Sequence, residues 1–154
     1  MAIYFVNSSA LVKRYISETG STWVLELFNP AIDNEIFVAA IAGVEIIAVI
    51  TRRARTGSIS TSDATTVRSQ FRNDLQTDYQ IVEIAEEIIN SGMALAETRG
   101  LRGYDAVQLA AGCAINELCL ASGLPAVTFV SADNQLNLAA AAEGLSVENP
   151  NSYP

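Results

Sequence analysis

The sequence predicts an α/β fold, a three-layer α/β/α sandwich in which helices cover both faces of a central, mostly parallel sheet. Three observations support this prediction. Short apolar runs rich in β-branched and aromatic residues alternate with longer segments that carry helix start and stop signals. Half of the residues are apolar, which is enough for a substantial core. The length of 154 residues suits one domain, which we expect over 1–148, followed by a short tail at 149–154.

The N-terminal part of the chain predicts one strand and two helices. Ala2–Val6 (AIYFV) is a short apolar run typical of a buried strand. Asn7–Ser9 are residue types that cap helix N-termini, so a helix is expected over about 10–17. A second helix is expected over 20–28 and ends before Pro30, which cannot continue it.

The middle of the chain continues the alternation. Glu35–Val38 is a candidate second strand, and a helix over about 41–55 follows it and ends at Gly57. Ser60 begins the next helix, because Ser60 and Asp63 resemble a capping box with Asp in place of Glu.

The second half of the chain repeats the same pattern. Glycines end the predicted helices at Gly100, Gly123 and Gly144, and Ser131 is the predicted N-cap of the last helix. The predicted strands are 79–82, 126–130 and 145–147, and the predicted helices are 85–99, 104–121 and 131–142.

The composition excludes several classes of chemistry. The chain has no histidine, which removes Ser-His-Asp and Cys-His nucleophiles and histidine-type ribonucleases. Two cysteines cannot supply the four ligands of a structural zinc site. The 17 acidic against 9 basic residues give a net charge of −8, which repels nucleic acid unless a metal ion or a local basic patch reverses the field.

Nothing in the sequence indicates a membrane protein or a secreted one. The longest apolar stretch, Phe37–Val44, is far shorter than a membrane span, and Met1–Val12 lacks the basic region of a signal peptide. We therefore expect a soluble, cytoplasmic protein.

Three carboxylates stand alone in apolar surroundings. Glu45, Asp105 and Asp133 are each the only charged residue in a stretch of at least 14 residues. An ionised carboxylate against an apolar wall is costly unless it is paired, hydrogen-bonded or bound to metal. Asp105 and Asp133 could simply be first-turn residues that helix N–H groups stabilise, and Glu45 could be half of a buried pair with an arginine.

The predicted fold places these acids near one another. In a parallel sheet, sites form beyond the carboxyl ends of the strands, where Asn7 and Asp133 each follow a predicted strand. Glu45 and Asp105 lie near helix starts, which can face the same edge. Clustered carboxylates repel, and hard cations such as Mg²⁺ or Mn²⁺ relieve the repulsion. Such a histidine-free site suggests phosphodiester hydrolysis by metal-activated water.

Four segments resemble the motifs of PIN-domain proteins, especially toxin ribonucleases of the VapC kind. The resemblance covers nearly the whole chain, in order and in spacing. The matching segments are Tyr4–Tyr15 with Glu18–Ser21; Val44-Glu45 with Arg52-Arg53 and Gly57–Ser60; Leu101–Ala110; and Phe129–Asp133 with Leu136 and Gly144-Leu145.

The resemblance implies a three-layer fold, a Mg²⁺ or Mn²⁺ site, cleavage of single-stranded RNA, a homodimer, and an antitoxin partner that blocks the site. It makes Glu45, Asp105 and Asp133 the metal-site acids. It makes Ser9 a hydroxyl that steadies the first acid or a metal-bound water, although Ser9 could equally be a helix cap without a catalytic role. The family's first acid is Asn7 here, and an amide lacks the negative charge.

Two further functions compete with the nuclease. One is a catalytically degenerate PIN domain that binds RNA or an antitoxin, which the loss of charge at Asn7 favours. The other is a phospho-acceptor receiver domain, which needs a lysine late in the chain, whereas the only lysine is Lys13. The nuclease interpretation, with activity weakened at Asn7, accounts best for the three retained acids.

A basic rim is expected to bind RNA beside the acids. It would consist of Arg52, Arg53 and Arg55 together with Lys13 and Arg14. The alternative is that these side chains only provide favourable charge at helix C-termini.

Overall fold

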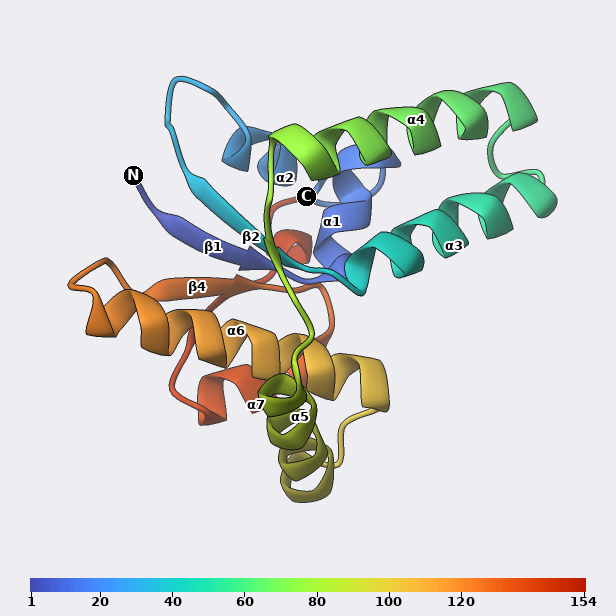
Figure 1. Ribbon diagram of the computed structural model, residues 1–154. Helices are drawn as coiled ribbons and strands as arrows, with labels where there is room; N and C mark the ends of the chain where they lie inside the picture. The colour runs from blue at the N-terminus through green and yellow to red at the C-terminus, as the bar shows by residue number, and fades with distance from the viewer.

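The computed structural model describes residues 1–154 and contains one five-stranded sheet whose strands are all parallel (Figure 1). The strands lie in the order β3-β2-β1-β4-β5, so that β1 is central. They are β1 (Ile3–Val6), β2 (Glu35–Ala39), β3 (Gln80–Val82), β4 (Val127–Val130) and β5 (Ser146–Glu148).

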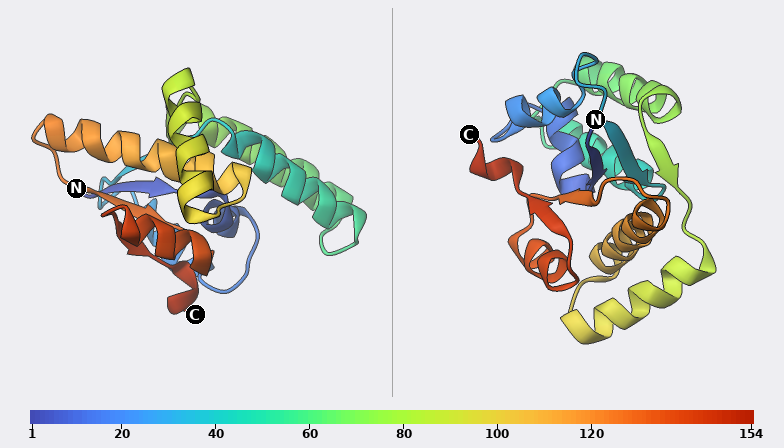
Figure 2. Two further views of the ribbon diagram at one scale, coloured as in Figure 1. Left: turned by 90° about the horizontal axis from the view of Figure 1, so that it is seen from below. Right: turned by 90° about the vertical axis from the view of Figure 1, so that its left-hand side faces the viewer.

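Helices cover both faces of this sheet, which confirms the predicted sandwich (Figures 1 and 2). They are α1 (Ser8–Tyr15), α2 (Ser21–Leu27), α3 (Ala42–Arg55), α4 (Thr61–Thr77), α5 (Glu86–Arg99), α6 (Gly103–Ala121) and α7 (Asn134–Ala142). Helices α1 to α4 lie on one face, and α5 to α7 lie on the other. No helix combines the length and the apolar character needed to cross a membrane.

The period of two along the strands divides the core between these faces. Ile3 and Phe5 of β1 pack with α5, α6 and α7, whereas Val6 packs with α1 to α4. Phe5 stacks on Phe129 of β4 with the ring centroids 5.5 Å apart. A Cβ atom at Gly112 of α6 would lie 2.9 Å from the Phe129 ring, so the absence of a side chain there lets α6 approach the sheet closely.

The predicted boundaries agree with the structure to within three residues, but one cap is wrong. The structure starts α7 at Asn134, and its N-cap is Asp133, whose side chain accepts a hydrogen bond from the Leu136 amide. Ser131 lies before the helix, where its hydroxyl accepts from the Asp133 amide instead. A carboxylate satisfies the free N–H groups of a helix start better than a more distant hydroxyl does.

The C-terminal residues, which the sequence separates as a tail, pack on the domain. Pro150–Ser152 forms a 3₁₀ turn against Gly20, and Tyr153 stacks on Trp23 with the ring centroids 5.0 Å apart. Gly20 has φ +86°, and a Cβ atom there would lie 2.4 Å from the Pro150 carbonyl oxygen. This close approach requires glycine.

Candidate active site

The sequence-predicted site residues gather at the carboxyl edge of the sheet. Asn7 directly follows β1, and Asp133 lies three residues after β4. Glu45 lies in the first turn of α3, which follows β2, and Asp105 lies in the first turn of α6. Sites in parallel α/β folds form at this edge, beyond the ends of the central strands.

The three acids are near enough to repel one another. The pKa of the half-buried Asp105 is raised, first by burial and then by the negative charges of Asp133 and Glu45. Arg102, an exposed side chain at the N-cap of α6, opposes this shift. A cation close to these acids would therefore stabilise the ionised form of Asp105.

Glu45 is held by two buried polar side chains. Its Oε1 atom accepts hydrogen bonds from the Ser8 hydroxyl at 3.1 Å and from Gln108 Nε2 at 2.9 Å. Gln108 Nε2 also donates to the Ser8 hydroxyl at 2.9 Å. The interpretation of Glu45 as half of a buried ion pair with an arginine is wrong, because its partners are neutral.

A second chain of hydrogen bonds joins the ends of β1 and β4. Asn7 Oδ1 accepts from the Ser9 backbone amide at 3.0 Å and from the Ser9 hydroxyl at 2.7 Å. The Ser9 hydroxyl accepts in turn from the Ala132 amide at 3.0 Å and lies 3.4 Å from the Ser131 hydroxyl. Ser9 thus orients the side chain of Asn7.

Asn7 is the N-cap of α1 and is almost fully buried. Because its oxygen accepts two hydrogen bonds, the amide nitrogen is the polar atom of this side chain that has no hydrogen-bond partner. An amide nitrogen is a donor and cannot bind a cation. Asn7 in this orientation therefore fits the role of a cap better than that of a metal ligand.

The other donors suit a hard divalent cation bound partly through water. Glu45 Oε2 and Asp133 Oδ2 accept no hydrogen bond, and neither oxygen of Asp105 does. No group of three or more Cys, Asp and Glu side chains lies close enough together to hold one ion directly. Mg²⁺ commonly keeps several waters and uses only one or two carboxylates, so these acids fit such an ion in chemistry and in charge.

The structure separates the residues of the predicted basic rim into three that form ion pairs and two that form none. Lys13 and Arg53 both pair with Glu18, at 3.0 and 3.1 Å. Arg14 pairs with Asp78 at 2.7 Å and is mostly buried. Arg52 and Arg55, at the end of α3, are exposed and form no ion pair. They are the residues of the predicted rim whose charge has no ion-pair partner.

We expect the double replacement of Arg52 and Arg55 by Ala to weaken RNA binding and to flatten its salt dependence. Each phosphate contact with single-stranded nucleic acid contributes about 0.7 to the slope of log K against log salt, so losing two contacts lowers the slope by about 1.4. Fluorescence anisotropy at several salt concentrations measures this slope. Arg99→Ala is the control, because Arg99 is paired with Glu143 at 2.6 Å. An unchanged slope in the double variant would show that Arg52 and Arg55 do not contact the RNA.

Sequence reasoning missed Gln108, Ser8 and Arg102. Gln108 had a detectable signal, because it is a long polar side chain inside the apolar segment AVQLAA and lies three residues after Asp105. Residues three apart share a helix face. Arg102 is also close to Asp105 in the sequence, but its exposure became known only from the structure.

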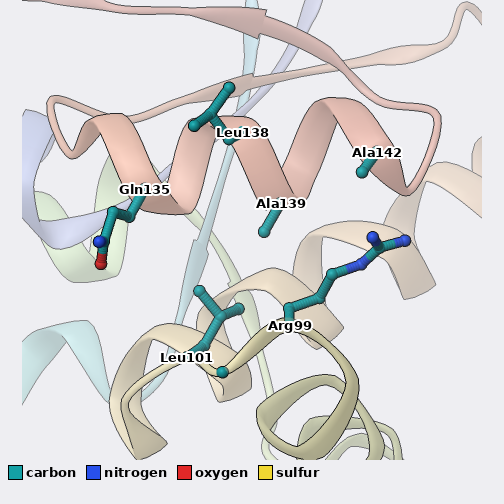
Figure 3. A pocket seen from close by; sticks show the side chains of 7 residues that line it. Arg99, Leu101, Gln135, Leu138, Ala139 and Ala142 are labelled. Carbon is teal, nitrogen blue, oxygen red and sulfur yellow. The ribbon is translucent and has the colours of Figure 1, made fainter.

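The surface has a groove that Arg99, Leu101 and Ala139 help to line. It runs between α7 and the connection from α5 to α6, where Ala139 points toward the segment that carries Arg99 and Leu101 (Figure 3). None of the three acids lines this groove.

Comparison with known proteins identifies the fold. No family model matches the chain, and no curated protein sequence matches it. Solved structures do match. One is a chain of VapBC2 from Rickettsia felis, in a structure bound to a DNA fragment from the VapBC2 promoter. Its TM-score is 0.64, and its sequence is 16% identical over 96% of this chain and 98% of that chain.

Two further structures give similar values. PAE2754 from Pyrobaculum aerophilum has a TM-score of 0.63 and 17% identity over 95% of this chain and 83% of that one. A toxin–antitoxin complex from Klebsiella pneumoniae has a TM-score of 0.61 and 16% identity over 96% and 97% of the two chains. The chain therefore has the PIN-like fold that its sequence motifs imply.

Proposed function

We propose that this protein is a metal-dependent endoribonuclease of the toxin–antitoxin kind, with weak activity because of Asn7. The observation that carries the proposal is the position of Asp105, half-buried at the carboxyl edge of the sheet, with its pKa raised by burial and by the charges of Asp133 and Glu45. Three mutually repelling acids without a basic partner of their own are typical of a cation site.

In this proposal Glu45, Asp105 and Asp133 would hold Mg²⁺ or Mn²⁺, with part of the coordination made through water molecules. When bound, the cation would supply an activated water and would neutralise charge on the scissile phosphate. Ser9 keeps the Asn7 amide in place and joins the ends of β1 and β4. Arg102, Arg52 and Arg55 would attract the RNA backbone to this acidic surface.

The likeness of fold supports a proposal about the partners. The solved structures that share the fold include a toxin–antitoxin complex from Klebsiella pneumoniae. We therefore propose that an antitoxin protein covers the acid site, that two copies of the chain form a homodimer, and that the protein acts on RNA in the cytoplasm.

The proposal is tested by measuring the Tm of the protein and its cleavage of RNA at increasing Mn²⁺ concentrations. A ligand that binds only the folded protein at a hundred times its Kd adds about 2.7 kcal/mol of stability, which corresponds to a rise in Tm of about 5–10 °C. We expect this rise in the natural sequence and its loss in Asp105→Asn. Asp63→Asn is the matched control, because Asp63 is an exposed acid at the start of α4.

Cleavage of labelled single-stranded RNA is measured in the same samples. We expect slow Mn²⁺-dependent cleavage that Asp105→Asn abolishes and Asp63→Asn leaves unchanged. The proposal is wrong if Mn²⁺ has no effect on the Tm and supports no cleavage in the natural sequence, and the same holds for Asn7→Asp.

A second function, a degenerate domain that binds RNA or an antitoxin without cleaving RNA, is favoured by the orientation of Asn7. The oxygen of Asn7 is already used by Ser9, so the position offers no ligand to a cation. RNA binding that persists in EDTA, together with no cleavage even in Asn7→Asp, would support this second function instead.

A further inference from the structure

The most unusual polar residue in the core is Gln108 on α6. Its side chain is fully buried, as are Leu109, Ala110 and other apolar residues of the same helix. The Nε2 group donates to Ser8 and to Glu45, both at 2.9 Å, whereas Oε1 is buried without any hydrogen-bond partner. The amide is therefore oriented by its two donated hydrogen bonds.

This arrangement is costly for stability alone. A buried carbonyl oxygen without a partner loses its hydration and receives nothing in return. A methionine of similar length would fill the same space without an unsatisfied atom. The amide is useful only through its donor group, and both hydrogens of that group are used at the edge of the acid site.

The two hydrogen bonds connect three elements around Glu45. Ser8 begins α1, Glu45 lies on α3, and Gln108 lies on α6 three residues after Asp105, on the same helix face. Because Ser8 and Gln108 both donate to Oε1 of Glu45, the Oε2 atom is the carboxylate oxygen that has no partner.

We propose that Gln108 is a positioning residue, which together with Ser8 holds Oε1 of Glu45 so that Oε2 would be free to bind a divalent cation. This inference rests on the proposed function, because it assigns Gln108 a role toward the same cation. Residues that orient a metal ligand commonly change metal affinity by 10- to 100-fold when they are replaced.

Gln108→Met tests the proposal, with Gln70→Met as the matched control. Gln70 is exposed on α4 and forms no hydrogen bond with Glu45. We expect Gln108→Met to keep or raise the metal-free Tm and to weaken Mn²⁺ binding, measured by calorimetry, about tenfold. Gln70→Met should leave both unchanged. Unaltered Mn²⁺ affinity in Gln108→Met overturns the inference.

Ser8→Ala provides a second route if Gln108→Met folds poorly. Ser8 and Gln108 act on the same oxygen, so Ser8→Ala should also weaken Mn²⁺ binding. The double variant should lose less than the product of the two single effects. If the loss of Mn²⁺ affinity in the double variant equals the product of the two single losses, Ser8 and Gln108 do not act together on Glu45. That result would also overturn the inference.

A measurement without metal separates this inference from the proposed function. In protein labelled with ¹³C at glutamate carboxyl carbons, the Glu45 signal is identified by its absence in Glu45→Gln. We expect this signal to move in metal-free Gln108→Met and not in Gln70→Met. An unmoved signal overturns the positioning role. A moved signal in a protein that never binds Mn²⁺ instead overturns the proposed function and leaves the Gln108–Glu45 contact standing.

Discussion

Replacing Asn7 by Asp is expected to tighten Mn²⁺ binding at least tenfold and to raise the rate of RNA cleavage. A carboxylate at this N-cap can keep one oxygen on the Ser9 amide, as Asn7 Oδ1 does now, and offer the other to a cation. At about 5 Å and an effective dielectric constant of about 20, one added negative charge attracts a divalent cation by roughly 7 kcal/mol before desolvation and screening reduce it. A tenfold gain requires only about 1.4 kcal/mol of this.

The same replacement should lower the Tm of the metal-free protein. A fourth acid at this edge would repel Asp105, Asp133 and Glu45, and the favourable interaction of a carboxylate with the N-terminus of α1 is worth only about 0.3–1 kcal/mol. The difference in Tm with and without Mn²⁺ therefore widens in Asn7→Asp. Differential scanning fluorimetry over a range of Mn²⁺ concentrations measures this difference.

Asn73→Asp is the control for this experiment. Asn73 is exposed on α4, so the variant carries the same change in net charge away from the acids. We expect Asn73→Asp to leave Mn²⁺ affinity and cleavage unchanged. Equal behaviour of the two variants would mean that position 7 is not where a metal ligand is missing, and the site built on Asp105, Asp133 and Glu45 would need a different fourth member.

The largest loss of stability is expected from Arg14→Met. Arg14 donates to Asp78 at 2.7 Å and to the Tyr79 hydroxyl at 2.8 Å, and its guanidinium lies 4.0 Å from the centre of the Phe28 ring. The nearby Asp74 is buried and lies 3.6 Å from Arg14. Removing the arginine leaves Asp74 with only the Tyr15 hydroxyl, which donates to it at 2.7 Å.

Breaking a buried ion pair by removing one partner typically costs about 3–5 kcal/mol. For a chain of this length we therefore expect the Tm to fall by about 6–20 °C. Arg52→Met is the control, because Arg52 is exposed without a partner and such surface changes stay within about 0.5 kcal/mol. Urea unfolding of both variants measures the free energies directly.

This experiment also distinguishes two roles for Arg14. If Arg14 is part of the fold, the Arg14→Met protein binds RNA like the natural sequence at temperatures where it stays folded. If Arg14→Met lowers the free energy of unfolding by less than about 1 kcal/mol and also weakens RNA binding, Arg14 instead belongs to the basic rim that the sequence predicts.

The sequence alone predicted most of the fold because the relevant signals are local. The strand at Ile3–Val6 and the helix stops at Gly100 and Gly144 depend on residues within a few positions of one another. The isolation of Glu45 and Asp105 in apolar segments likewise marked them as acids with a special environment. In the structure the pKa of Asp105 is raised, first by burial and then by the charges of Asp133 and Glu45.

Only the tertiary structure decided which polar groups are paired. Lys13 lies five residues from its partner Glu18, but Arg14 meets Asp78 across 64 positions and Gln108 meets Glu45 across 63. The sequence placed Arg14 in a basic rim, because nothing near Arg14 in the sequence shows that Asp78 lies beside it in the fold. Local sequence governs backbone conformation and the apolar face of each element, whereas the pairing of charges depends on which distant elements the sheet order brings together.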